Sequence, residues 1–227
     1  MIGLIGSTGM LGGTLQQQTQ FDKLYNTTNI DQITNTNFDL LVVSAPSADR
    51  RRANTNAHDD LINIKSLIDV LTQVAAEQVI LLSTIDALAF PDTPYGANRK
   101  FLSEQVLQLS STNKVIYLAA PIGDQVKKGL LYDLKNQQFL DSIDAGSVQQ
   151  YTPLEYLWTY INMVRSLSER SYYFFSEPVT TAKILDEFFP DMVKKYSKSP
   201  VRYDFNKYQF TSAFIFEQMQ KYFRIVV

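Results

Sequence analysis

The sequence has 227 residues, of which 45% are hydrophobic and 19% are charged, and its formal net charge at pH 7 is −2. This composition predicts one main globular domain and excludes a low-complexity chain. The basic residues are scattered apart from one cluster, Arg50-Arg51-Arg52, so a general role in binding nucleic acid or a polyanionic membrane has no electrostatic support.

The sequence contains no cysteine, which excludes disulfides, thiol nucleophiles and cysteine metal sites and fits a reducing compartment. Because His58 is the only histidine, we expect no serine-histidine triad and no multi-histidine metal site. Any acid-base catalysis would therefore use tyrosine, lysine or carboxylate side chains. The apolar run at the N-terminus is too short for a signal peptide, and no other run approaches the ~20 residues of a membrane span. We therefore expect a cytoplasmic protein with no membrane partner.

A glycine-rich turn follows the first expected strand. Residues 2–5 are an apolar run, and Gly6, Gly9 and Gly12 come next, at the start of a helix-compatible segment at residues 10–20. Gly6 can adopt backbone dihedral angles that other residues rarely adopt. Without a side chain at Gly9, a pyrophosphate can approach the backbone, and without one at Gly12 the helix can pack on the strand. The helix N-terminus offers N–H groups to an anion. The loop predicts dinucleotide binding; the alternative is a turn with no ligand.

The spacing Gly-x-x-Gly-x-x-Gly differs from the Gly-x-Gly-x-x-Gly fingerprint and resembles that of the extended or atypical short-chain dehydrogenase/reductase superfamily. This resemblance implies an α/β Rossmann-like fold, a doubly wound parallel sheet with a small C-terminal substrate lobe, and NAD or NADP as cofactor. Residues 1–227 would form a single NAD(P)-binding domain, to which residues 121–227 contribute the substrate lobe and the last sheet elements. The candidate cofactor-binding residues are Gly6, Thr8, Gly9, Met10, Leu11, Gly12, Asn26, Thr28, Ala45, Pro46 and Arg99.

The second expected strand, Leu24-Tyr25, leads into a polar segment at residues 26–29. An acidic residue at this place would bind the adenosine ribose hydroxyls of NAD, but the sequence has Asn26. Neutral groups neither repel a 2′-phosphate nor require one, so the choice between NAD and NADP stays open. The segment could equally be a simple turn.

The next expected strand, residues 39–43, ends in small residues that would let the adenosine half of the cofactor lie over the sheet edge. Arg50-Arg51-Arg52 either binds phosphate or is a solvated loop. Apolar residues between positions 61 and 71 recur at helical spacing and predict a crossover helix.

The strand expected at residues 79–82 exits through Ser83-Thr84-Ile85-Asp86, and a helix opens at Tyr95. In short-chain dehydrogenases/reductases a serine or threonine at this strand end and a Tyr-x-x-x-Lys at the next helix form the catalytic set. Thr84 and Tyr95 match this set, but the fourth residue after the tyrosine is Arg99.

Helix geometry favours Arg99 over Lys100 as the partner of Tyr95. At about 100° per residue, Arg99 lies nearly above the tyrosine, whereas Lys100 is rotated from it by about 140°. A guanidinium beside Tyr95 is expected to stabilise the phenolate, to lower the pKa of the tyrosine and to hold the nicotinamide ribose hydroxyls. The alternative is a helix-start aromatic residue with a surface neighbour.

The strand expected at residues 115–119 leads to segments that resemble compact NAD-dependent sugar-nucleotide epimerase/dehydratase-like proteins. Thr152 is expected to cap a helix that begins at Pro153, and Thr180 to cap a later one. A late strand is expected at residues 172–175. The aromatic-rich remainder could cover the site or form a homodimer surface.

These features predict an NAD(P)-dependent oxidoreductase, epimerase or dehydratase that acts on a sugar, most simply a nucleotide-linked one. Tyr95 would be the acid/base, Thr84 would hydrogen-bond the reacting oxygen and Arg99 would tune the tyrosine. The alternative is a non-catalytic sensor or regulatory protein that has kept the dinucleotide site, which the missing lysine favours.

Overall fold

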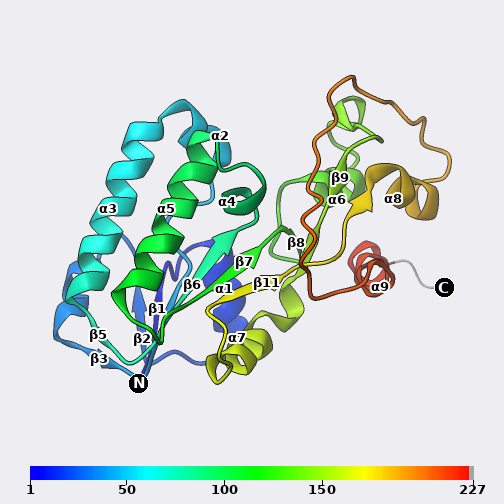
Figure 1. The fold of residues 1–227 in the computed structure, drawn as a ribbon. Coiled ribbons are helices and arrows are strands. Elements are labelled where there is room, and N and C mark those ends of the chain that lie inside the picture. Colours follow the sequence, from blue (N-terminus) through cyan, green and yellow to red (C-terminus); the bar gives the residue numbers. More distant parts are fainter. Residues whose placement is uncertain (225–227) are drawn as a thin grey trace. The chain divides into compact units, whose positions relative to one another are not determined.

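The computed structural model describes residues 1–224, with the exception of the Asn35 side chain (Figure 1). The chain divides into two compact units. The first comprises Met1–Tyr117 and Tyr156–Tyr172, and the second comprises Leu118–Glu155 and the described residues from Tyr173 onward.

A six-stranded parallel sheet has the strand order β11-β7-β6-β4-β1-β2. Its strands are β1 Ile2–Ile5, β2 Lys23–Tyr25, β4 Leu40–Val43, β6 Val79–Thr84, β7 Lys114–Leu118 and β11 Ser171–Phe174. Every residue of β4 and β7 is buried, as expected for parallel strands covered on both faces. The strands expected from the apolar runs are therefore confirmed.

Helices cover both faces of this sheet (Figure 1). Helix α3 packs on α5, and α1 packs on α7. The helices of the first unit are α1 Met10–Gln18, α2 Arg50–Thr55, α3 Ala57–Gln73, α4 Asp86–Ala89, α5 Pro94–Leu109 and α7 Leu157–Arg165. Short elements complete this unit: the 3-10 helix η1 Ile30–Asn35 and the strands β3 Asn37–Phe38 and β5 Ala75–Ala76. The predicted Rossmann-like α/β fold and the crossover helix are confirmed.

The strand order reverses at β1, which pairs with β2 on one side and with β4 on the other. In open α/β sheets, ligands bind beyond the carboxyl ends of the strands at such a reversal. The loops after Ile5 and Val43 leave the sheet at this point, because these two residues are register partners. The fold therefore brings the glycine loop and the residue 44–47 loop to the same edge.

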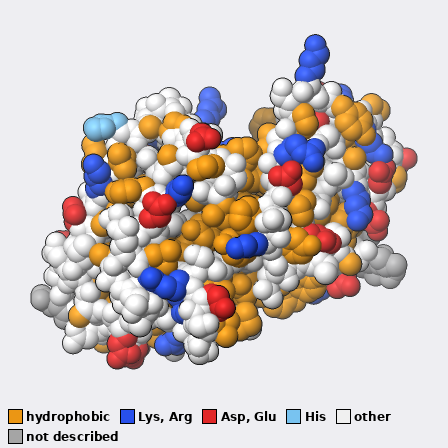
Figure 2. All heavy atoms as spheres, in the orientation of Figure 1, with side chains coloured by type: hydrophobic (Ala, Val, Ile, Leu, Met, Phe, Trp, Pro, Cys, Tyr) orange, Lys and Arg blue, Asp and Glu red, His pale blue; other side chains and the backbone are white. Residues whose placement is uncertain are grey.

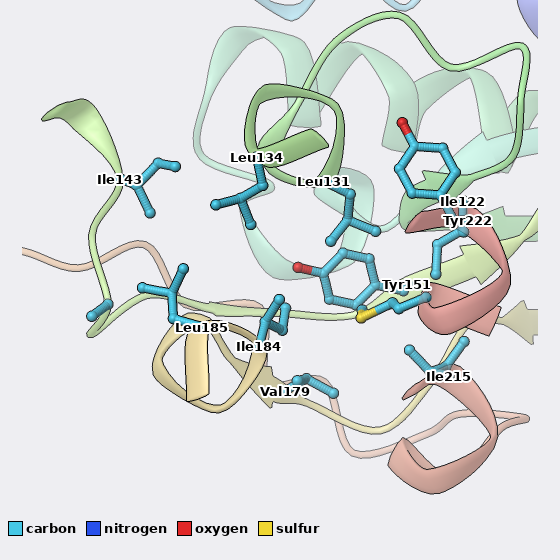
Figure 3. Packing of buried hydrophobic residues seen from close by; sticks show 12 residues of the cluster. Ile122, Leu131, Leu134, Ile143, Tyr151, Val179, Ile184, Leu185, Ile215 and Tyr222 are labelled. Carbon is cyan, nitrogen blue, oxygen red and sulfur yellow. The ribbon is translucent and has the colours of Figure 1, made fainter. Parts of the chain in front are cut away.

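The second unit is built around its own apolar core. Its elements are β8 Ala120–Ile122, α6 Leu130–Lys135, η2 Leu140–Ser142, β9 Val148–Gln149, β10 Tyr151–Pro153, β12 Val179–Thr180, α8 Thr181–Phe188 and α9 Ser212–Phe223. Figure 3 shows side chains from these elements and the loops between them converging on Tyr151, whose ring is fully buried.

The helix expected after Thr152 exists, because α7 contains Leu157 and Ile161 as buried residues, but its expected start at Pro153 is wrong. Residues 151–153 form β10, which pairs in parallel with β8, and α7 begins only at Leu157, after the 3-10 helix η3 Leu154–Tyr156. The Thr152 hydroxyl is buried and donates to the Phe174 carbonyl, while it accepts from the Ala119 N–H at 2.8 Å. The Thr152 hydroxyl therefore bonds the Ala119 N–H and the Phe174 carbonyl, and does not cap a helix. The cap expected from Thr180 is confirmed, because its hydroxyl accepts from the Lys183 N–H.

Charged side chains are dispersed over the face of the molecule drawn in Figure 2. Among the described residues, no helix is both long enough and apolar enough to cross a membrane.

Candidate functional site

The glycine loop after β1 is held by the neighbouring strand β2. Gly6 has a φ of +87°, a value that favours glycine, and its N–H donates to the Tyr25 carbonyl at 2.9 Å. The Ser7 N–H and hydroxyl donate to the same carbonyl, so Ser7 is turned inwards and buried. The next residues, Thr8, Gly9 and Met10, are exposed. The loop therefore presents its second half to solvent.

Gly9 and Gly12 differ in what surrounds them. A Cβ on Gly12 would lie 2.2 Å from the Gly6 carbonyl oxygen, so this glycine is required by the contact between α1 and the loop. A Cβ on Gly9 would meet only that same oxygen, at 3.4 Å, which is an ordinary contact. Gly9 is also the N-cap of α1 and provides no side-chain cap. The bare backbone and the uncapped helix N-terminus fit a dinucleotide pyrophosphate.

Ser44 fixes the glycine loop from the other side, a contact that the sequence analysis missed. Its hydroxyl lies 3.0 Å from the Ile5 carbonyl oxygen and 3.2 Å from that of Gly6. A Cβ on Gly6 would lie 2.7 Å from this hydroxyl oxygen, which gives a second reason for glycine there. Ala45 and Pro46 follow, half-buried and joined by a cis peptide bond.

The polar segment after β2 is a self-contained turn. The Asn26 Oδ1 accepts from the N–H and the hydroxyl of Thr28, and the Asn29 Oδ1 accepts from the Asn26 N–H. This is the simple turn that the sequence analysis kept as an alternative. The role of Asn26 and Thr28 in cofactor binding stays a prediction.

The arginine cluster opens the short helix α2, which Asp49 caps. All three arginines are exposed, and Arg50 pairs through Nε with an Asp86 carboxylate oxygen at 3.2 Å. Arg50 also lies 5.7 Å from the centre of the Phe90 ring. This member of the cluster therefore has structural partners within the first unit.

Thr84 ends β6, and Tyr95 stands in the first turn of α5. Two local features start this helix: Thr93 accepts a hydrogen bond from the Gly96 N–H as N-cap, and Pro94 occupies the first turn. A distant residue, Asn54, accepts from the Tyr95 N–H at 2.9 Å. Gly96 is required because a Cβ there would lie 2.0 Å from the Phe90 carbonyl oxygen. The close approach of α4 and α5 brings the Tyr95 side chain near Thr84, whose hydroxyl acts to lower the pKa of the tyrosine.

Arg99 lies on the same helix face as Tyr95, as predicted, and Lys100 is exposed. The guanidinium carbon lies 4.5 Å from the centre of the tyrosine ring. Its two terminal nitrogens bond both oxygens of Asp60 at 2.9 and 3.0 Å, and Nη2 also donates to the Ser47 carbonyl. Arg99 is only 4% exposed. Asp60, which the sequence analysis assigned no partner, thus holds the arginine and, through it, the loop after β4.

The expected lowering of the Tyr95 pKa is wrong. Burial raises the pKa of Tyr95 above its ordinary value of 10.0, and this effect outweighs the lowering by the Arg99 guanidinium. The Asp86 carboxylate raises it further, although hydrogen bonds from Arg99 and Thr84 to the phenolate act in the opposite sense. The tyrosine is 4% exposed, and the residues next to it in the sequence do not reveal this desolvation.

Asp86 is a buried carboxylate beside the candidate catalytic pair, and the sequence analysis gave it no role. Its Oδ2 accepts the Thr84 hydroxyl at 3.0 Å, and its own N–H donates back to that hydroxyl oxygen at 3.2 Å. The only sequence signal was an acidic residue two positions after the strand end. In the part of the chain that the structure describes, no group of three or more His, Asp or Glu side chains is arranged to hold a metal ion.

No protein-family model and no curated protein sequence matches this chain. Solved structures do match it over nearly its whole length. One is DesIV, a dTDP-glucose 4,6-dehydratase from Streptomyces venezuelae with NAD and TYD bound (12% identity, TM-score 0.69, 98% of this chain and 96% of that chain covered). Another is a dTDP-4-dehydrorhamnose reductase from Yersinia enterocolitica (14% identity, TM-score 0.71, 98% of each chain).

A third is the UDP-glucose 4-epimerase of Thermus thermophilus in complex with NAD (14% identity, TM-score 0.68, 100% of this chain and 99% of that chain). The chain therefore has the Rossmann-like α/β fold of these structures. These neighbours share a fold and differ in reaction, since one is a dehydratase, one a reductase and one an epimerase. At this identity the similarity establishes the fold, and the chemistry has to be argued from the site.

Proposed function

We propose that this protein binds NAD(H) or NADP(H) at the glycine loop and catalyses proton-coupled hydride transfer at a sugar carbon, with Tyr95 as the acid/base. The observation that carries this proposal is the placement of Thr84 at the end of β6 and of Tyr95 in the first turn of α5, with the Arg99 guanidinium 4.5 Å from the centre of the tyrosine ring. Two hydroxyls at the carboxyl end of a parallel sheet are suited to bind one substrate oxygen.

The candidate cofactor residues fit a dinucleotide. Gly9 provides open backbone, Gly12 permits the tight turn, and the N-terminus of α1 has no side-chain cap of its own. Ala45 and Pro46 are small residues at the neighbouring strand end, where the adenosine half would lie. When bound, the nicotinamide would exchange hydride with the carbon whose oxygen faces Tyr95.

The residues of this chain would handle the proton. Tyr95 gives a proton to the reacting oxygen when a carbonyl is reduced and takes it back when the alcohol is oxidised. Thr84 keeps this oxygen close to the tyrosine. Arg99 would position the tyrosine ring rather than act as a proton relay, since it is stacked on the ring and bonded to Asp60. A nucleotide-linked sugar is the proposed substrate because the fold neighbours include a dehydratase and an epimerase named for such sugars.

Tyr95→Phe tests this function, because it removes one hydroxyl and little volume. The variant should keep the fold and the cofactor affinity and lose about 10²–10⁴-fold in turnover, the usual contribution of a general acid/base. The measurement is incubation of wild type and variant with NAD(P) and a panel of nucleotide sugars, followed by mass spectrometry and by absorbance of reduced nicotinamide. Full activity in Tyr95→Phe would contradict the role of the tyrosine.

The second candidate function is a non-catalytic dinucleotide sensor. The specific observation in its favour is that Arg99, in the place of the family lysine, is engaged by Asp60 and Ser47. A wild-type protein that binds cofactor and transforms no sugar in the panel would support the sensor.

A further inference from the structure

The loop at residues 44–47, which leaves the sheet after β4, is fixed at both of its ends. At the first end, the Ser44 hydroxyl lies 3.2 Å from the carbonyl oxygen of Gly6 in the glycine loop. At the second end, the Ser47 carbonyl accepts a hydrogen bond from the Arg99 Nη2 at 2.9 Å. The two residues between these contacts are the candidate cofactor residues of the loop, and both are half-buried. The backbone path of this loop therefore depends on Arg99.

Arg99 is held in the direction of Ser47 by the Asp60 carboxylate. The Asp60 Oδ2 accepts from Nη1 at 2.9 Å, and its Oδ1 accepts from Nη2 at 3.0 Å. Because a guanidinium is a rigid planar fork, two parallel bonds to one carboxylate fix its plane as well as its position. Nη2 carries two hydrogens, of which one is directed to Asp60 and the other to the Ser47 carbonyl. Asp60 thereby directs the second hydrogen to the loop.

The same guanidinium packs on Tyr95. Its carbon atom lies 4.5 Å from the centre of the tyrosine ring, within the range in which a cation is attracted to an aromatic face. Only 5% of the Arg99 side chain is exposed, so water competes little for these contacts. One cation therefore contacts three parts of the first unit: the loop after β4, helix α3 through Asp60, and the proposed acid/base on α5.

A lysine at position 99 is expected to lose this arrangement. Its ammonium nitrogen would lie about where the guanidinium carbon of Arg99 lies, one covalent bond short of both terminal nitrogens. A single nitrogen at that point cannot form parallel bonds to the two oxygens of Asp60 and also reach the Ser47 carbonyl, because the two terminal nitrogens of the arginine divide these acceptors between them. The arginine in the place of the family lysine is therefore matched to Asp60 and to the loop.

We propose, on the basis of the dinucleotide site proposed above, that Arg99, oriented by Asp60, is a positioning residue for the cofactor: it fixes the loop at residues 44–47 through the Ser47 carbonyl. Neither Arg99 nor Asp60 touches the cofactor in this role. A loop that is already ordered loses less conformational entropy when a dinucleotide binds, so the contact raises the affinity without adding an interaction with the ligand. The arginine then has a role of its own in place of the role of the family lysine.

The first experiment probes the loop without any cofactor, by limited trypsin digestion of the folded protein. The exposed arginine cluster at residues 50–52 follows the loop directly, and a helical segment is cut only when it opens locally. Mass spectrometry gives the rate of cleavage after residues 50–52 relative to the rate after Arg165, which lies at the end of α7 in the same unit. This relative cleavage rate reports local opening of the loop and of α2.

The test variants are Arg99→Lys, Asp60→Asn and the double variant. Lys100→Arg and Asp59→Asn are the matched controls, because they alter exposed neighbours in the same two helices. All the substitutions at positions 99 and 100 keep a trypsin site, so the number of cleavage sites does not change. Thermal unfolding establishes that each variant is folded.

Loss of a hydrogen bond from a charged donor changes an opening equilibrium on the order of tenfold. A rise of about this size in the relative cleavage rate of Arg99→Lys and Asp60→Asn, with no rise in the two controls, supports the proposal. An unchanged relative rate in Arg99→Lys overturns it, and so does a rise that is equal at both cleavage sites, which would show a general loss of stability. The double variant should open no more than Arg99→Lys, because both substitutions act through one contact, and additive effects would overturn the role of Asp60.

Isothermal titration calorimetry of NAD and NADP with the same folded variants tests the consequence for the cofactor. The wild type and the two controls should bind with equal affinity, and Arg99→Lys and Asp60→Asn with about tenfold lower affinity. A wild type that binds a dinucleotide with the same affinity as Arg99→Lys retains the proposed function and loses the positioning role. A wild type that binds neither dinucleotide but shows the selective cleavage loses the proposed function and the cofactor part of this proposal, and it retains the fixed loop.

Discussion

The Asp60 carboxylate binds both terminal nitrogens of Arg99, at 2.9 and 3.0 Å, and joins helix α3 to helix α5. The pair is almost fully buried, with 5% of the Arg99 side chain and 12% of the Asp60 side chain exposed. Asn98 adds a third donor, at 2.9 Å from the Asp60 Oδ2. The arginine that stacks on Tyr95 is therefore fixed by a residue 39 positions away in the sequence.

Removal of Asp60 should destabilise the fold. Asp60→Ala leaves the Arg99 guanidinium buried without its counter-charge, and breaking a buried pair in this way costs about 3 kcal/mol or more. Urea unfolding should show a lower midpoint for this variant. Asp59→Ala is the matched control, because Asp59 is the exposed neighbour on the same helix, and it should change stability by no more than about 0.5 kcal/mol. Equal stabilities of the two variants would contradict the assignment.

Tyr151→Phe should stabilise the second unit. The Tyr151 hydroxyl is buried and has no hydrogen-bond partner among the described residues, and such a group costs about 1–3 kcal/mol. The ring stays in place, so the free energy of unfolding should rise by about 1 kcal/mol. Tyr25→Phe is the control, since the hydroxyl of Tyr25 pairs with the Thr36 hydroxyl, and it should stabilise less or destabilise. A loss of stability in Tyr151→Phe measured by urea unfolding would refute the prediction.

Alkaline pH should destabilise the protein from about pH 10 upward. Burial raises the pKa of Tyr160 to about 12, and burial also raises the pKa of four further tyrosines, which are Tyr95, Tyr151, Tyr172 and Tyr222. Because the unfolded chain ionises first, near pH 10, the stability is complete below this pH and falls as the pH rises towards the folded-state values. Burial lowers the pKa of Lys114, and this shift alone would make the protein more stable as the pH rises. We expect the five tyrosines to outweigh this single lysine.

Urea unfolding at pH 8, 10 and 11 measures this dependence. A free energy of unfolding that stays constant or rises between pH 10 and pH 11 would be inconsistent with buried neutral tyrosines.

The parts of the molecule that depend on local sequence could be predicted. A continuous apolar run such as Leu40–Val43 predicts a strand that is buried on both faces. The glycines at 6, 9 and 12, which follow the apolar run at residues 2–5, predict a tight turn from strand to helix. Helix periodicity placed Arg99 rather than Lys100 on the face of Tyr95.

Partners distant in the sequence could not be predicted. Nothing local to Asp60 signals that Arg99 will pair with it, and nothing local to Tyr95 reveals the burial that raises its pKa. Thr152-Pro153 has the local chemistry of a helix start, but pairing with β8 determines its conformation. The contact of Ser44 with the Ile5 carbonyl and that of Asp86 with Arg50 join residues far apart in the sequence, which only the folded chain brings together.

Isothermal titration calorimetry of NAD and NADP with wild type and Gly9→Val tests the central claim most directly. Gly9 has room for a Cβ, so the variant should fold, whereas a side chain at this position should block the approach of a pyrophosphate to the backbone. Gly13→Val is the matched control, because a Cβ on Gly13 meets nothing within 4 Å and lies beyond the loop. Wild type and Gly13→Val should bind at least one of the two dinucleotides, and folded Gly9→Val should bind neither. Absence of binding by the wild type, or equal affinity in Gly9→Val, would contradict the claim.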